Sequence, residues 1–184
     1  MRKYGFVRVG AAIPEVEVAN CDINTKSIIS IIEEAEKNNI EILVFPELCI
    51  TGYTCGDLFY QEKLIRESEK AVFNILSNTI NKEMLVVIGA PVKVGYQLFN
   101  CAIALNKGNI LSIVPKTFLP NYNEFYEKRW FSPATKGREK EISYCKQEVP
   151  FGTDIILQHK SFKELCIGIE ICEDLWGIIP PSSI

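Results

Sequence analysis

Two short apolar runs, at residues 42–45 and 85–89, place the strongest constraint on how this chain can fold. Neither run contains a polar side chain, which is typical of a strand that is covered on both of its faces. A helical pattern precedes each run, because apolar residues recur at helical spacing in residues 28–35 and again in residues 61–76. This alternation of strands and helices predicts an α/β fold in which helices cover a sheet.

Further strands are predicted on both sides of these runs. Residues 6–13 form an apolar N-terminal strand candidate, and residues 98–105 and 110–114 are two more, joined by the turn Asn-Lys-Gly-Asn at residues 106–109. A hairpin added to strands that are separated by helices gives a mixed sheet. Residues 132–150 carry two prolines, one glycine and many charges, so we expect a surface excursion there.

Composition limits the class of protein. With 184 residues, of which 47% are hydrophobic and 23% charged, the chain can bury roughly 70% of its unfolded surface in one core. The formal net charge of -3 gives no reason to expect nucleic acid or an anionic membrane as partner. No apolar run approaches the roughly 20 residues of a membrane span.

The cysteines point to a reducing compartment. There are seven, an odd number without a Cys-x-x-Cys pair, so neither a disulfide framework nor a zinc site is suggested. We therefore expect a cytoplasmic protein without a bound metal. Cys49, Cys101 and Cys166 lie inside apolar runs and are predicted to belong to the core.

One cysteine stands apart from the others. The apolar run at residues 165–171 ends at Cys172, and Glu173 and Asp174 follow, as acidic residues do in the first turn of a helix. A cysteine at such a strand-to-helix turn has backbone N–H donors close to its sulfur, which favours the thiolate and stabilises an anionic intermediate. The alternative is that Cys172 is a small apolar filler.

Three predicted strand ends carry reactive groups: Glu47, Lys116 and Cys172. Such groups gather at strand ends in α/β sheets. Together they make a plausible set, because Glu47 can take the thiol proton in a dry pocket and Lys116 can hold an oxyanion. Taken singly, each has an ordinary alternative: a solvated cap for Glu47 and a surface charge for Lys116.

A Cys-His pair is the competing arrangement. It needs a histidine, and the only one is His159. That residue lies in a polar stretch with lysines close by, which favours an exposed turn. Glutamate and lysine are thus the residues available to assist the cysteine.

Four stretches carry a resemblance to a known family. They are residues 45–53 (FPELCITGY), 115–122 (PKTFLPNY), 123–131 (NEFYEKRWF) and 170–176 (EICEDLW). In order and rough spacing they resemble the motifs of the nitrilase (carbon–nitrogen hydrolase) superfamily. Within it, the chain is similar to the N-terminal glutaminase domains of glutamine-dependent NAD+ synthetases, from about residue 5 to the end.

This resemblance implies an α-β-β-α sandwich and a role for each reactive group. Glu47 would be the general base, Lys116 the oxyanion stabiliser and Cys172 the nucleophile that forms a thioester. Glu124 matches the second glutamate that such sites place beside the triad.

The resemblance also implies a substrate. Tyr122 and Glu173 match positions that contact glutamine, and a carboxylate such as Glu173 suits the α-ammonium group. A first-turn helix charge is the ordinary alternative for Glu173. The implied reaction converts glutamine and water to glutamate and ammonia, and the ammonia serves an ATP-dependent amidation of deamido-NAD+ to NAD+.

The chain lacks motifs for that second reaction. It contains neither a P-loop nor a Ser-Gly-Gly-rich pyrophosphate motif, so we expect ATP and Mg to bind a C-terminal synthetase domain that is absent here. Residues 1–184 are then one glutaminase domain, incomplete at the C-terminus, without a cofactor of its own and associating as a homo-oligomer. The alternatives are a stand-alone amidase for another small amide or N-carbamoyl compound, and a non-catalytic docking domain with an inert Cys172.

Overall fold

A mixed five-stranded sheet forms the centre of the structure, a computed structural model that describes residues 5–135 and 140–183. The first three strands in the order β1-β2-β3-β4-β5 pair in parallel, and the remaining pairs are antiparallel. This confirms the predicted mixed sheet, although β1 is shorter than expected. The strands are β1 (Val9–Ala11), β2 (Ile42–Val44), β3 (Leu85–Val94), β4 (Gln97–Asn106) and β5 (Asn109–Pro115).

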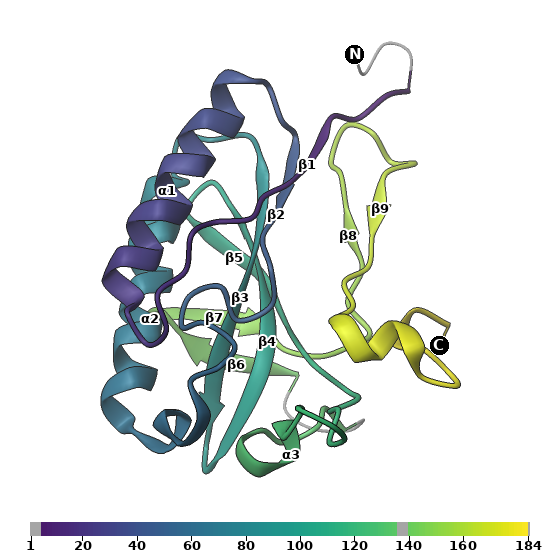
Figure 1. Cartoon of the computed structure of the whole chain (residues 1–184). Coiled ribbons are helices and arrows are strands. Elements are labelled where there is room, and N and C mark those ends of the chain that lie inside the picture. The colour runs from purple at the N-terminus through teal and green to yellow at the C-terminus, as the bar shows by residue number, and fades with distance from the viewer. Residues whose placement is uncertain (1–4, 136–139, 184) are drawn as a thin grey trace.

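Two long helices, α1 (Cys21–Lys37) and α2 (Glu62–Asn78), lie side by side on one face of this sheet (Figure 1). Both were predicted from their apolar stripes. Helix α1 begins before its apolar stripe, because the Asn20 side chain accepts a hydrogen bond from the backbone N–H of Ile23 and caps the helix. Within the described residues, no helix combines the length and apolar character needed to cross a membrane.

The β4–β5 hairpin has the predicted turn. Lys107 and Gly108 both adopt positive φ, 51° and 73°, the backbone that a two-residue hairpin turn with the strands' own twist requires. The hairpin is long, and its inner side chains belong to the main core.

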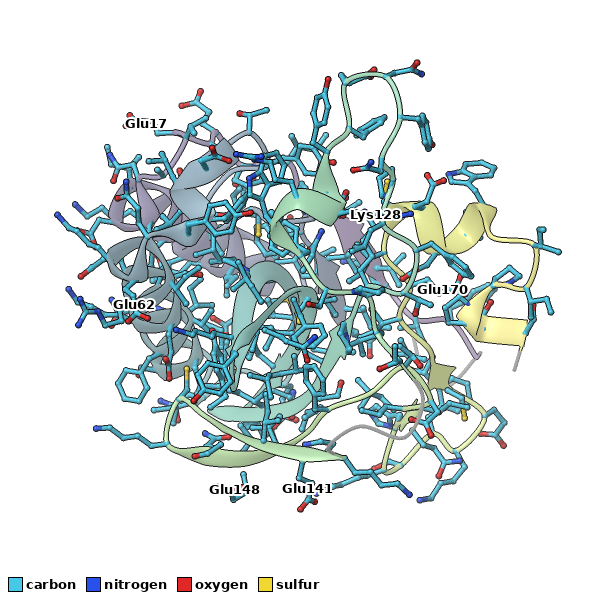
Figure 2. The ribbon with its side chains drawn as sticks, turned by 90° about the horizontal axis from the view of Figure 1, so that it is seen from below. Glu17, Glu62, Lys128, Glu141, Glu148 and Glu170 are labelled. Atoms are coloured by element: carbon cyan, nitrogen blue, oxygen red, sulfur yellow. The ribbon has the colours of Figure 1, made fainter. Side chains whose placement is uncertain are left out.

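The predicted surface excursion at residues 132–150 is wrong in its second half. Strands β6 (Glu141–Tyr144) and β7 (Gln147–Pro150) form a hairpin whose buried side chains, among them Ile142 and Val149, join the core. The charged residues that suggested a loop alternate with buried ones, and Figure 2 shows Glu141 and Glu148 pointing outward. Residues 136–139 of the excursion lie outside the described part of the chain.

Another, smaller hairpin lies on the sheet face opposite the two helices (Figure 1). It consists of β8 (Leu157–Gln158) and β9 (Cys166–Ile167), so the strand predicted at residues 165–171 is only two residues long. Its neighbours Ile169 and Ile171 pack with Val87 and Ala104 of the sheet. The helices, the sheet and this partial further layer give an α/β fold, as predicted.

The cysteine predictions are partly confirmed. Cys49 and Cys101 are buried in the core, but Cys166 is exposed. Among the strands that the structure describes, its strand, β9, pairs only with β8, and Cys166 is not covered by the rest of the fold. The apolar run that contains Cys166 was therefore a poor predictor of its burial.

Candidate active site

Glu47 stands on a tight turn that passes directly over strand β3. Leu48 has a positive φ of 51°, and the backbone N–H of Phe45 donates to the carbonyl of Val87 at 2.9 Å. A Cβ atom on Gly89 would lie 2.3 Å from the backbone nitrogen of Leu48. Only glycine at position 89 leaves room for this turn, which presents the Glu47 carboxylate at the end of β2.

Lys116 follows strand β5 and is completely buried, with 0% of its side chain exposed. Its backbone N–H donates to the carbonyl of Asn100 on β4, 2.8 Å away. Its ammonium Nζ lies 2.6 Å from Oε1 of Glu47 and 2.7 Å from Oε1 of Glu127. The structure therefore brings Lys116 and Glu47 together, between two carboxylates.

The second glutamate is Glu127, and this corrects the interpretation of Glu124. Glu127 begins the one-turn helix α3 (Glu127–Trp130), is 1% exposed and accepts a hydrogen bond from the Tyr53 hydroxyl at 2.8 Å. Glu124 lies on an exposed turn three residues earlier. Both glutamates belong to one aromatic-rich stretch, and only the helical turn shows which of them faces Lys116.

A surface ion pair holds this short helix. Arg129 donates from Nε and Nη2 to the two carboxylate oxygens of Asp57, at 2.7 and 2.9 Å, and Trp130 donates to the same carboxylate at 2.9 Å. The Arg129 guanidinium keeps the pKa of Asp57 well below its usual range. These contacts tie α3 to the 3₁₀ helix η2 (Gly56–Tyr60), and so fix the backbone that carries Glu127.

Asn100 is a further member of the cluster that the sequence did not reveal. Its side-chain Nδ2 donates to Oε1 of Glu47 at 2.5 Å and approaches Oε2 of Glu127 at 3.5 Å. It is 1% exposed. Since Oε1 of Glu47 is held by both Asn100 and Lys116, the other oxygen remains available to accept a proton.

The two carboxylates of this cluster stabilise the ammonium between them. Burial alone would lower the pKa of Lys116, but Glu47 and Glu127 outweigh it and raise that pKa. Burial raises the pKa of Glu127, against the opposing effect of Lys116. A permanently charged ammonium is thus held at the end of β5, where it can stabilise a developing negative charge.

Cys172 begins the 3₁₀ helix η3 (Cys172–Trp176) with a positive φ of 47°. The predicted turn is present, but the helix after it has only five residues. Its side chain is exposed. Glu47 and Cys172 both line a cavity of about 130 Å³ between the sheet and the segment at residues 169–172.

The expected preference for thiolate is not what the structure shows. Partial desolvation, and then Glu47, raise the pKa of the Cys172 thiol, while Lys116 and the backbone N–H of Glu173 act in the opposite direction. The resting sulfur is therefore protonated at neutral pH, and its activation requires a base. Glu47 lines the same cavity and can serve as that base.

Tyr122 and Glu173 contact each other beside Cys172. The Tyr122 hydroxyl donates to Oε2 of Glu173 at 3.0 Å, and this bond raises the pKa of Tyr122. The structure thus brings both predicted substrate-binding residues next to Cys172. His159 instead accepts hydrogen bonds at Nδ1 from the backbone of Ser161 and Phe162 and belongs to its own polar turn.

Within residues 5–135 and 140–183, no group of three or more His, Cys, Asp or Glu side chains could hold a metal ion. The reactive groups that the site brings together are a thiol, a carboxylate and an ammonium.

Sequence relatives share most of this chain but are much longer. Glutamine-dependent NAD(+) synthetases of Mycobacterium tuberculosis and Homo sapiens are each 30% identical, over 181 and 180 residues, and the matches cover 98% and 88% of this chain. The same matches cover 26% and 25% of those proteins. The chain therefore spans about a quarter of the length of these relatives.

Solved structures and a family model also match this chain. A glutamine-dependent NAD(+) synthetase from Cytophaga hutchinsonii superimposes with a TM-score of 0.82 at 33% identity, over 91% of this chain and 28% of that one. An amidase from Nesterenkonia sp. AN1 shares the fold, with a TM-score of 0.69 at 15% identity, over 92% of this chain and 59% of that one. The model of the carbon-nitrogen hydrolase family matches residues 9–177. The chain belongs to the carbon-nitrogen hydrolase family.

Proposed function

We propose that this chain hydrolyses the side-chain amide of glutamine to glutamate and ammonia. The observation that carries the proposal is the buried Lys116 ammonium, held by Glu47 and Glu127. The Lys116 charge acts on the Cys172 thiol, and Cys172 lines the same cavity as Glu47. A thiol, a base and a fixed cation are what acyl transfer from an amide requires.

The first step forms a thioester at Cys172. Glu47 takes the thiol proton, and the sulfur attacks the amide carbon. Lys116 uses two of its three N–H groups for Glu47 and Glu127, which leaves the third for the oxyanion. The backbone N–H of Glu173, close to the sulfur, is a second donor.

Release of ammonia completes the thioester, and hydrolysis then regenerates the cysteine. The proton held by Glu47 passes to the leaving nitrogen, the C–N bond breaks and ammonia departs. Glu47 then takes a proton from water, whose oxygen attacks the thioester. The C–S bond breaks, glutamate leaves and the sulfur recovers its proton, so the sum is glutamine plus water to glutamate plus ammonia.

Glutamine recognition is assigned to Tyr122 and Glu173. The Glu173 carboxylate lies beside the nucleophile turn and is oriented by the Tyr122 hydroxyl. A carboxylate in this place attracts the α-ammonium of an amino acid and gives no such contact to a simple amide. The pair thereby distinguishes glutamine from other small amides.

The partner is inferred from the relatives. They are about four times as long as this chain and are glutamine-dependent NAD(+) synthetases. We propose that residues 1–184 form a glutaminase domain that supplies ammonia to an ATP-dependent C-terminal synthetase domain, which amidates deamido-NAD+ and binds ATP and Mg. We also propose that the chain forms a homo-oligomer and that it is located in the cytoplasm. The free cysteines at all seven positions support a reducing compartment.

Steady-state hydrolysis of glutamine and of propionamide tests the assignment of substrate. We expect glutamine to be preferred, and the Glu173→Gln variant to raise the KM for glutamine at least tenfold while leaving propionamide hydrolysis within about twofold. Tyr122→Phe should raise the same KM by a smaller factor. Equal effects on both substrates would favour a stand-alone amidase. Absence of turnover together with an unreactive Cys172 would favour a docking domain.

A further inference from the structure

Asp174 is a buried carboxylate to which the reaction above assigns no task. It lies two residues after Cys172 and is 1% exposed. Its Oδ1 accepts hydrogen bonds from the backbone N–H groups of Thr117 and Phe118, at 2.9 and 2.7 Å. Its Oδ2 accepts a third from the backbone N–H of Ile171, at 3.3 Å.

These three bonds connect the two segments that carry the reacting groups. Thr117 directly follows Lys116, and Ile171 directly precedes Cys172. The bond between Thr117 and Asp174 spans 57 positions of the chain. A local helix cap would explain the bond to Ile171, but it does not explain the two shorter bonds to the far segment.

We propose that Asp174 is a positioning residue that fixes where the Cys172 sulfur stands relative to the Lys116 ammonium. Sulfur must reach the carbonyl carbon while Nζ reaches the carbonyl oxygen, so both must keep one geometry during the attack. A misplacement of about 1 Å can cost about 100-fold in rate. The inference rests on the proposed function only for this attack, and it is independent of glutamine.

A carboxylate suits this position better than any other small side chain. It presents acceptors in both directions and carries no N–H of its own, so all three backbone donors are satisfied. Burial raises the pKa of Asp174, while the three backbone N–H groups counteract burial. An asparagine could satisfy the Thr117 and Phe118 donors, but its NH₂ would then face the N–H of Ile171 and loosen the Cys172 side.

Two reactions of the same sulfur separate positioning from mere folding. 4-Nitrophenyl acetate forms a C–S bond to Cys172 and releases 4-nitrophenolate, through an oxyanion that needs Lys116. Iodoacetamide alkylates the sulfur by displacing iodide and needs no oxyanion donor. Both reactions are followed by intact mass, and Cys172→Ala subtracts labelling at the other cysteines.

We expect Asp174→Asn to slow acylation by the ester at least tenfold and to leave alkylation within about twofold. Asp154→Asn, at an exposed position, is the matched control and should change neither rate. If Asp174→Asn does not fold, Asp174→Glu keeps the charge, displaces the acceptors and is judged by the same two rates. Equal changes of both rates, or unchanged acylation in a folded variant, would overturn the proposal.

A failure of the proposed function would look different. Wild-type chain that reacts with the ester but does not hydrolyse glutamine would contradict the glutaminase assignment and leave the comparison of the two rates intact. The ratio of acylation to alkylation is therefore the quantity that tests Asp174 alone.

Discussion

The Nζ atom of Lys116 lies 2.7 Å from Oε1 of Glu127, and both side chains are almost completely buried. Because the same ammonium also contacts Glu47, two carboxylates share one cation. A buried charge that loses one of its partners is strongly destabilised. Glu127 therefore acts on Lys116 and, through it, on the reaction.

Glu127→Gln should lower both stability and activity. Replacing the buried carboxylate by an amide removes one of the two charges that hold Lys116, so we expect about 3 kcal/mol lower unfolding free energy. The hydrolysis rate should fall about 100-fold. Urea denaturation and a glutaminase assay measure the two effects.

Glu124→Gln is the matched control for that prediction. Glu124 lies in the same stretch but on an exposed turn, and its replacement should leave both quantities close to wild type. Loss of activity in Glu124→Gln together with an active Glu127→Gln variant would contradict the assignment of Glu127, and not Glu124, as the glutamate that holds Lys116.

Gly89→Ala should displace the turn that carries Glu47 and so lower activity. A Cβ atom would meet backbone atoms of Leu48, Pro46 and Glu47 at 2.3, 2.7 and 2.9 Å, and backbone cannot move aside as a flexible side chain can. The turn that carries Glu47 must shift, so we expect a loss of about 1–3 kcal/mol in stability. Activity should fall about 100-fold or more.

Gly168→Ala supplies the comparison. No atom lies within 4 Å of a Cβ built at Gly168, so this variant should keep its activity within a few fold. Equal activity of the two alanine variants would show that the Glu47 turn can move without consequence, contrary to its proposed role.

The pH dependence of Cys172 alkylation follows from its raised pKa. Because partial desolvation and Glu47 raise the pKa of this thiol, the thiolate fraction keeps growing with pH. We expect the iodoacetamide rate to increase about tenfold per unit from pH 7 to pH 9. A plateau below pH 8 would indicate a preformed thiolate.

Glu47→Gln should separate thiol reactivity from catalysis. Removing the negative charge of Glu47 lowers the pKa of Cys172, since that charge raises it, and so alkylation at pH 7 should accelerate severalfold. Hydrolysis should fall by about 100-fold or more, because the general base is lost. Slower alkylation would contradict the effect of the Glu47 charge on the thiol pKa, and unchanged hydrolysis would contradict the role of Glu47 as base.

Glu47, Lys116 and Cys172 could be proposed from the sequence because each follows an apolar run, where the end of a strand could be located. The position of Glu127 beside Lys116 was not predicted. A helix of one turn, held by Asp57, decides which glutamate of its stretch points inward. Asn100 was not predicted either, because a polar residue within a predicted strand gives no sign of its hydrogen bond to Glu47.

The fold could be predicted where a pattern is local. Helices α1 and α2 and the β4–β5 turn depend on spacing within one segment. The burial of β6–β7 depends instead on contacts with distant parts of the core, as does the exposure of Cys166. Figure 2 places Glu170, beside the nucleophile turn, on the side of the molecule away from Glu62 of α2, a separation that only tertiary structure defines.

Alkaline conditions should destabilise the fold through its buried thiols. Burial raises the pKa of Cys21 to about 11 and of Cys49 and Cys145 to about 12. In the unfolded chain the thiols ionise near pH 9, whereas in the folded chain they stay protonated. Stability is thus fully present below about pH 9 and is lost as the pH rises toward 11–12.

The slope of that loss is measurable. Each thiol contributes about 1.4 kcal/mol per pH unit at most, and urea denaturation under reducing conditions at pH 8, 9, 10 and 11 reports the sum. In Cys49→Ala the loss per pH unit should be smaller than in wild type. Unfolding free energies that stay constant from pH 8 to pH 11 would rule out this contribution.

We propose Cys172 as the nucleophile of a glutamine site. Intact-mass spectrometry after exposure to a glutamine-mimicking electrophile tests this role, with wild type compared to Cys172→Ala. We predict a single adduct that free glutamine slows and that Cys172→Ala abolishes. Labelling spread over several of the seven cysteines, and indifferent to glutamine, would contradict the claim.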